Sequence, residues 1–127
     1  MNKILVVDDQ EEIQQLLVDA LSDEGYDVFC ESTGEAALAR LENEDFHVFF
    51  LDLQLPGMDG LELCKKIRKD RIAECIYAMT GFTSVYDFLE CRKAGFDDYF
   101  VKPLDIRLIM KAANEGFEKL LRWTKNI

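Results

Sequence analysis

The chain has 127 residues, which is enough for one globular domain with a buried core and too few to divide into two, so we expect a single domain over residues 1–127. Fifteen basic and 25 acidic residues give a formal net charge of −10, which repels phosphate backbones and argues against direct nucleic-acid binding. No stretch approaches the ~18 apolar residues of a membrane span, and the apolar run in residues 4–7 is too short for a signal peptide. We therefore expect a soluble, cytoplasmic protein without a membrane contact.

Short β-branched or aromatic runs alternate with longer stretches whose apolar residues recur at helical spacing. In chain order, the pattern predicts strands at residues 3–7, 26–30, 48–51, 76–79 and 99–101. Between and after them it predicts helices at residues 10–23, 36–41, 60–69 and 84–94 and from residue 104 onward. This alternation indicates a parallel α/β sheet.

Capping residues predict several helix ends. Asp9 is a candidate cap for the first helix, and Ser32 with Glu35 resembles a capping box before the second. Asp59 can cap the third helix, and Gly95 is a stop signal for the fourth.

Two residue types that often mark metal sites have simpler interpretations here. The cysteines at positions 30, 64, 75 and 91 lack C-x-x-C spacing and sit among apolar or helical residues, so we expect buried free thiols. His47 precedes the third strand and is the only histidine, so we expect a surface residue, neither a metal ligand nor a phosphodonor.

Charged or reactive residues follow four of the five predicted strands. Because the ligand site of such a sheet lies at the carboxyl ends of its strands, these side chains converge if the fold is right. Three carboxylates brought together repel one another and require a compensating cation, and Mg2+ prefers oxygen ligands. The residues are Asp8 and Asp9 after the first strand, Asp52 at the third, Thr80 after the fourth, and Lys102 with Pro103 after the fifth.

At these positions the sequence resembles the response regulator receiver domains of bacterial two-component signalling. The matching segments are LVVDD at 5–9, LDLQLPGMDG at 51–60, AMTG at 78–81 and AGFDDYFVKP at 94–103. The resemblance covers essentially the whole chain, and four motifs in order are far more specific than any one. It implies a flavodoxin-like α/β fold with three layers: a five-stranded parallel sheet of order 2-1-3-4-5 with five helices on its two faces.

The resemblance also implies a phosphoryl-accepting site. Asp52 would accept a phosphoryl group from a histidine kinase or a histidine phosphotransfer protein. Asp9, Asp52 and the backbone carbonyl of Gln54 would bind Mg2+, or Mn2+ in its place, with Asp8 acting largely through water. Such a domain is a signalling switch that promotes its own phosphoryl transfer and a slow hydrolysis, not an enzyme with a separate substrate.

A switch needs an element that can adopt two arrangements, and the resemblance indicates which residues form that element. Lys102 would pair with Asp52 or its phosphoryl group, Thr80 would offer its hydroxyl to that group, and Gly81 would leave it room. Tyr99 would turn inward behind Thr80 and change the surface of the fourth helix, fifth strand and fifth helix. That surface would serve partners, a homodimer or an output domain outside this chain. Pro103 is the candidate for a cis peptide bond.

The last predicted helix has apolar residues over about half of its wheel, more than one sheet face needs. We therefore expect the side with Ile106, Met110, Phe117 and Leu121 to be partly exposed and to form a dimer or partner contact. Gly116 inside this helix costs ~1 kcal/mol relative to alanine, which indicates either close packing or a helix that loosens beyond it.

Three other functions would each require a different sequence pattern. A haloacid-dehalogenase-like phosphatase would need D-x-D where this chain has Asp52-Leu53-Gln54. A flavodoxin-like cofactor site would need a phosphate-binding loop after Val7, where acidic residues stand instead. A binding module of the same fold that never carries phosphate stays open, although its usual sign, loss of one of the site residues, is missing here. Gln54 and Phe82 are expected to flank the phosphoryl site and control water access.

Overall fold

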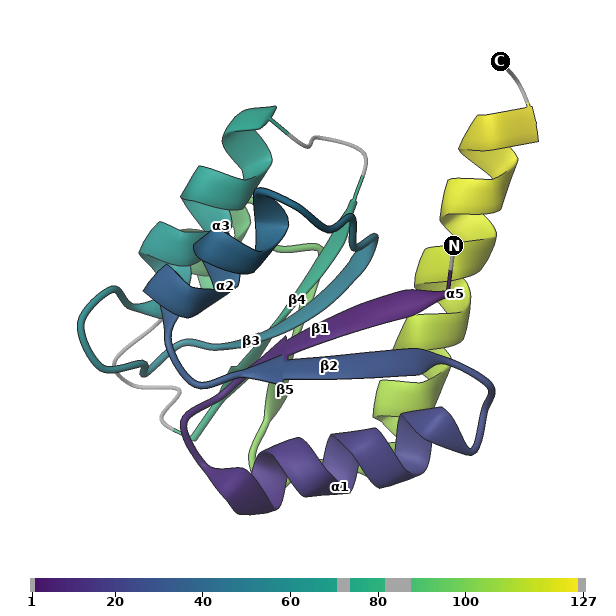
Figure 1. Cartoon of the computed structure of the whole chain (residues 1–127), viewed down its shortest axis with the longest axis horizontal. Coiled ribbons are helices and arrows are strands. Elements are labelled where there is room, and N and C mark those ends of the chain that lie inside the picture. Colours follow the sequence, from purple (N-terminus) through teal and green to yellow (C-terminus); the bar gives the residue numbers. More distant parts are fainter. Residues whose placement is uncertain (1, 71–73, 82–87, 126–127) are drawn as a thin grey trace.

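Figure 1 shows the computed structural model, which describes residues 2–70, 74–81 and 88–125. Its middle layer is a five-stranded parallel sheet of order β2-β1-β3-β4-β5, as the family resemblance implied. The strands are β1 (Lys3–Val7), β2 (Asp27–Glu31), β3 (Val48–Asp52), β4 (Cys75–Thr80) and β5 (Asp98–Val101). The helices are α1 (Glu11–Ser22), α2 (Gly34–Leu41), α3 (Gly60–Asp70), α4 (Phe88–Ala94) and α5 (Ile106–Lys125).

Alternate residues of each central strand belong to two separate cores, one on each face of the sheet. Leu5 and Phe49 pack with α2, α3 and α4 in one core, whereas Val6 and Phe50 pack with α1 and α5 in the other. Every residue of β3 and β4 is buried, which explains why their sequences are apolar on both faces. The three-layer architecture predicted from the sequence is therefore confirmed.

Two of the predicted helix ends are confirmed. Asp59 Oδ1 accepts a hydrogen bond from the backbone N–H of Glu62 at 2.9 Å, so Asp59 caps α3. Gly95 ends α4 with a φ of +108°, a conformation that favours glycine because it has no Cβ. The predicted start of the fourth helix, at residue 84, lies outside the described residues.

Three other helix starts differ from the prediction. Thr33, and not Ser32, caps α2, because its Oγ1 accepts the Ala36 N–H at 3.1 Å. The cap predicted at Asp9 is wrong, since Gln10 occupies the N-cap position of α1. The last helix begins at Ile106, two residues later than predicted. Asp105 precedes it, and its Oδ1 accepts the Arg107 N–H at 3.0 Å.

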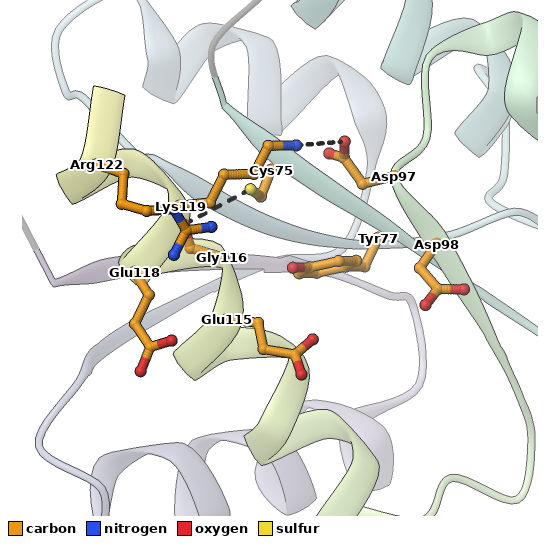
Figure 2. A pocket seen from close by; sticks show the side chains of 9 residues that line it. All are labelled: Cys75, Tyr77, Asp97, Asp98, Glu115, Gly116, Glu118, Lys119 and Arg122. Carbon is orange, nitrogen blue, oxygen red and sulfur yellow. Dashed lines mark hydrogen bonds and ion pairs between the residues drawn. The ribbon is translucent and has the colours of Figure 1, made fainter. Parts of the chain in front are cut away.

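Gly116 lets α5 pack closely on the sheet (Figure 2). A Cβ at this position would lie 3.0 Å from Tyr77 Oη and 3.3 Å from Cys75 Cβ. Close packing, and not loosening, is therefore the explanation of this glycine, and α5 continues regularly to Lys125.

The prediction of a partly exposed apolar side on α5 is confirmed for three of its four residues and wrong for Phe117. Phe117 is buried and stacks on Tyr26 with ring centroids 4.9 Å apart, while Met110 is half-buried against the same core. Of the other residues predicted to be partly exposed, Ile106 is half-buried and Leu121 is exposed. The exposed large apolar residues of α5 are Leu108, Leu121 and Trp123.

The cysteines are free thiols, as predicted: Cys64, Cys75 and Cys91 are buried and Cys30 is half-buried. His47 is partly exposed, with its Nδ1 3.8 Å from a carboxylate oxygen of Glu74. Within the described part of the chain, no helix has the length and apolar character needed to cross a membrane.

Candidate functional site

The acidic residues after β1 and β3 meet at one edge of the sheet. These strands are neighbours, and Val7 is in register with Leu51, so the residues that follow lie side by side. Asp8, Asp9 and Asp52 each offer a carboxylate oxygen, and these oxygens lie within 4.8 Å of one another. Asp8 and Asp52 are buried and Asp9 is exposed, which leaves the cluster open to solvent on one side.

Lys102 supplies a positive charge to this cluster from the end of β5. Its Nζ lies 2.9 Å from Asp8 Oδ2 and 3.4 Å from Asp52 Oδ2. Burial, followed by the charge of Asp8, raises the pKa of the Asp52 carboxyl, while Lys102 and the backbone N–H of Gln54 oppose the rise. One ammonium group cannot neutralise three carboxylates, so the oxygen-rich cluster fits a further hard cation such as Mg2+.

A cavity of about 230 Å³ lies over the cluster. The Gln54 backbone N–H donates to Asp52 Oδ1 at 3.2 Å, which fixes the Asp52 carboxylate from the side of the loop after β3. No described atom comes within 4 Å of a Cβ built on Gly81, so the cavity is open there. Its lining residues are Asp9, Gln10, Asp52, Gln54, Gly81 and Lys102.

The remaining predicted residues lie on β4 and β5 next to this cavity. Thr80 is buried at the end of β4, and its carbonyl accepts the backbone N–H of Lys102 at 2.8 Å. The peptide bond between Lys102 and Pro103 is cis, as the resemblance implied. Tyr99 is half-buried on β5, where it packs against the core under α3 and α4. Phe82 lies outside the described residues.

Two residues of the site were not predicted from the sequence. The side chain of Gln10 accepts a hydrogen bond from Lys102 Nζ at 3.3 Å, and Gln10 lines the cavity. A Cβ on Gly60 would lie only 2.3 Å from the carbonyl oxygen of Asp52, so α3 can begin against the backbone of Asp52 only with glycine there. Position in the sequence was the available signal, since Gln10 directly follows Asp9 and Gly60 follows a capping Asp59.

A second hollow, of about 320 Å³, lies at the amino ends of β4 and β5 beside α5 (Figure 2). One of its lining carboxylates, Asp97, lies 2.7 Å from Arg68 Nη2 and 3.6 Å from Lys119 Nζ and accepts the Ile76 N–H at 2.8 Å. These contacts connect α3, β4 and α5. Asp97 therefore has a structural role, and the cluster at the carboxyl ends of the strands is the candidate site.

Comparison with known proteins agrees with this geometry. The family model described as the response regulator receiver domain matches residues 4–114. This chain belongs to the response regulator receiver domain family. It is 41% identical over 105 residues to the alkaline phosphatase synthesis transcriptional regulatory protein PhoP of Bacillus subtilis, an alignment that covers 83% of this chain and 44% of PhoP. It is 34% identical to the response regulator ArlR of Staphylococcus saprophyticus, over 87% of this chain and 50% of ArlR.

Solved receiver structures have the same fold. A CheY-like receiver domain protein from Methanospirillum hungatei matches with a TM-score of 0.90 and 32% identity, over 96% of this receiver and 98% of that chain. DrrB of Thermotoga maritima, an OmpR/PhoB homolog, matches with a TM-score of 0.84 and 31% identity, over 94% of this receiver and 54% of DrrB. The chain thus spans half or less of the length of PhoP and ArlR and about half of DrrB.

Proposed function

We propose that this receiver domain is a switch in which Asp52 accepts a phosphoryl group from the phosphohistidine of a histidine kinase or a histidine phosphotransfer protein. The observation that carries the proposal is the position of Asp52 at the end of β3. There its carboxylate borders an open cavity, belongs to the cluster of three acids and lies 3.4 Å from Lys102 Nζ.

The transfer is a substitution at phosphorus. A carboxylate oxygen of Asp52 forms the new O–P bond, the P–N bond to the donor imidazole breaks, and the released imidazole nitrogen keeps the electron pair and takes up a proton. Lys102 and the Gln54 N–H both favour the ionised carboxylate that this attack requires. Lys102 also faces the charge that arrives with the phosphoryl oxygens.

The residues around Asp52 fit a divalent cation. The carboxylates of Asp8, Asp9 and Asp52, with the backbone carbonyl of Gln54, would hold Mg2+, or Mn2+ in its place. When bound, the ion neutralises negative charge on the carboxylates and on the transferring oxygens. The domain promotes its own phosphorylation and a slow hydrolysis of the aspartyl phosphate, and it turns over no separate substrate.

Phosphorylation would act through β4 and β5. Thr80 would turn its hydroxyl toward the phosphoryl group beside the open position at Gly81, and Tyr99 would follow it inward. Large apolar side chains are exposed on all three elements of the expected output surface: Leu89 on α4, Val101 on β5 and Leu108 on α5. This surface would bind a second copy, another partner or an output domain outside this chain, as the greater length of PhoP and ArlR favours.

The test is the intact mass of the protein after incubation with acetyl phosphate, with and without Mg2+. We expect a Mg2+-dependent gain of one phosphoryl group that is lost in Asp52→Asn. Asp45→Asn is the matched control, because it removes the same charge from an exposed position in the loop before β3. No gain in the parent, together with no Mg2+ binding, would refute the proposal and favour a module that works without phosphate.

A further inference from the structure

The Lys102 ammonium group is shared among three oxygen atoms. Nζ lies 2.9 Å from Asp8 Oδ2, 3.3 Å from Gln10 Oε1 and 3.4 Å from Asp52 Oδ2. A lysine ammonium has three N–H donors, so this arrangement can use all of them. The shortest contact is to Asp8 and the longest is to the proposed phosphoacceptor.

Gln10 contacts both members of the Asp8–Lys102 ion pair. Its backbone N–H donates to Asp8 Oδ1 at 2.9 Å, while its side-chain oxygen accepts from Lys102. The three residues form a closed ring of polar contacts. The backbone of Gln10 is fixed as well, because its carbonyl accepts the N–H groups of Ile13 and Gln14 in the first turn of α1, both at 3.2 Å.

We propose that Gln10 is a positioning residue that holds Lys102 on Asp8 in the resting domain and thereby slows phosphorylation of Asp52. This inference rests on the proposed function. Lys102 must turn toward the phosphoryl oxygens when Asp52 is modified, and it gives up the Gln10 amide oxygen as it does so. Loss of one such hydrogen bond corresponds to a change of about two- to tenfold in an equilibrium or a rate.

Two substitutions at this position should have opposite effects. Gln10→Met keeps the length of the side chain and removes the acceptor, so Lys102 is released. Gln10→Glu keeps the acceptor and adds a charge that attracts Lys102 more strongly. A steric or folding defect would not reverse its sign between the two variants. Gln15→Met and Gln15→Glu are matched controls, because Gln15 is an exposed residue of α1 whose amide donates to Asp19.

The first measurement needs no phosphorylation. Exchange of the Lys102 ammonium protons with water is followed by NMR in the unmodified, 15N-labelled protein. We expect exchange at least about threefold faster in Gln10→Met than in the parent, and slower in Gln10→Glu. Unchanged exchange in Gln10→Met would overturn the proposal.

The second measurement is the rate of phosphorylation by acetyl phosphate at saturating Mg2+, which removes any difference in ion affinity. We expect Gln10→Met to react about two to ten times faster than the parent and Gln10→Glu to react more slowly, with both Gln15 variants unchanged. Rates that move in the same direction in both Gln10 variants, or do not move, contradict the proposal. If the parent is not phosphorylated, the proposed function fails, while the exchange measurement still decides on Gln10.

Discussion

At the scale of single residues, the site places a buried carboxylate beside a second one, which is electrostatically unfavourable. Asp52 is almost fully buried beside Asp8, and both effects raise the pKa of its carboxyl. A group poised in this way destabilises its own fold when it is ionised, and such groups concentrate at functional sites. A bound cation would relieve the repulsion between the carboxylates of Asp8 and Asp52.

Asp52→Asn should therefore stabilise the domain in the absence of divalent cations. Because folding raises the pKa of Asp52, its contribution to stability is fully present below about pH 3.8 and is lost as the pH rises through the folded-state value. We expect the variant to exceed the parent in free energy of unfolding by on the order of 1 kcal/mol at pH 7. The difference should shrink toward pH 4. Urea unfolding in EDTA, followed by circular dichroism, measures the free energy of unfolding of the parent and the variant at each pH.

Added Mg2+ provides the control for this experiment. An ion that binds only the folded state raises the free energy of unfolding by RT ln(1 + [ion]/Kd). The parent, with the full set of carboxylates, should therefore gain more than Asp52→Asn, and the difference in stability between them should narrow. A variant less stable than the parent at pH 7 in EDTA would show that Asp52 is a net stabilising residue.

At the scale of helices and strands, the periodicity of the sequence predicted most of the fold. Each predicted strand overlaps the observed one, with ends that differ by at most one residue. For β3 and β4 the reason is that their continuous apolar sequences reflect burial on both faces of the sheet. Helix starts were predicted less accurately than strand ends. Ser32 and Thr33 are adjacent, and both residue types are good N-caps. Thr33 is the N-cap of α2 because its backbone is extended, and this conformation depends on the connection between β2 and α2.

The parts of the site that sequence patterns missed depend on distant contacts. The strand-end positions and the motifs predicted that Asp8, Asp52 and Lys102 converge. Gln10 directly follows Asp9 in the sequence, but its contact with Lys102, which is 92 positions away in the chain, is seen only in the structure. The burial of Phe117 similarly depends on stacking with Tyr26, which a wheel of α5 alone cannot show.

The fit of α5 against the sheet gives a testable prediction at this scale. Gly116→Ala gains up to ~1 kcal/mol of helix propensity, but its Cβ would lie 3.0 Å from Tyr77 Oη, and overpacking of this kind costs about 1–3 kcal/mol. We expect a net loss of about 1 kcal/mol in the free energy of unfolding, measured by urea titration.

A double-mutant cycle with Tyr77→Phe identifies the cause. Removal of the hydroxyl, which donates to the Ala112 carbonyl at 2.8 Å, also removes the atom that the new Cβ would meet. Gly116→Ala should then cost at least about 0.5 kcal/mol less in the Tyr77→Phe background. Equal costs in the two backgrounds would mean that contacts other than the hydroxyl limit the approach of α5.

At the scale of the whole molecule, the sheet connects the site to the proposed output surface. The cavity lies at the carboxyl ends of β1, β3, β4 and β5, and β5 is the edge strand that follows β4 in the sheet. Lys102 at the end of β5 and Tyr99 within it are separated by two residues. A rearrangement of Lys102 at the cavity can therefore alter β5 directly, and through β5 the neighbouring surfaces of α4 and α5.

The apolar residues on that surface make the output testable. The parent, phosphorylated with acetyl phosphate, is expected to self-associate more strongly than the unmodified protein. Leu108→Glu, at a position that is 51% exposed on α5, should weaken this association about tenfold, because burial of a leucine is worth about 1.5 kcal/mol or more. Sedimentation equilibrium measures the association, and intact mass confirms equal phosphorylation.

Leu16→Glu on α1 is the matched control, since Leu16 is also exposed, at 39%, but belongs to a helix outside the α4-β5-α5 surface. It should leave self-association unchanged. Met110→Glu would be less informative than Leu108→Glu, because Met110 is half-buried against the core shared by α1 and α5 and the charge would disturb packing. If Leu108→Glu is phosphorylated and associates like the parent, α5 does not form the contact, and an interface elsewhere must account for any self-association observed.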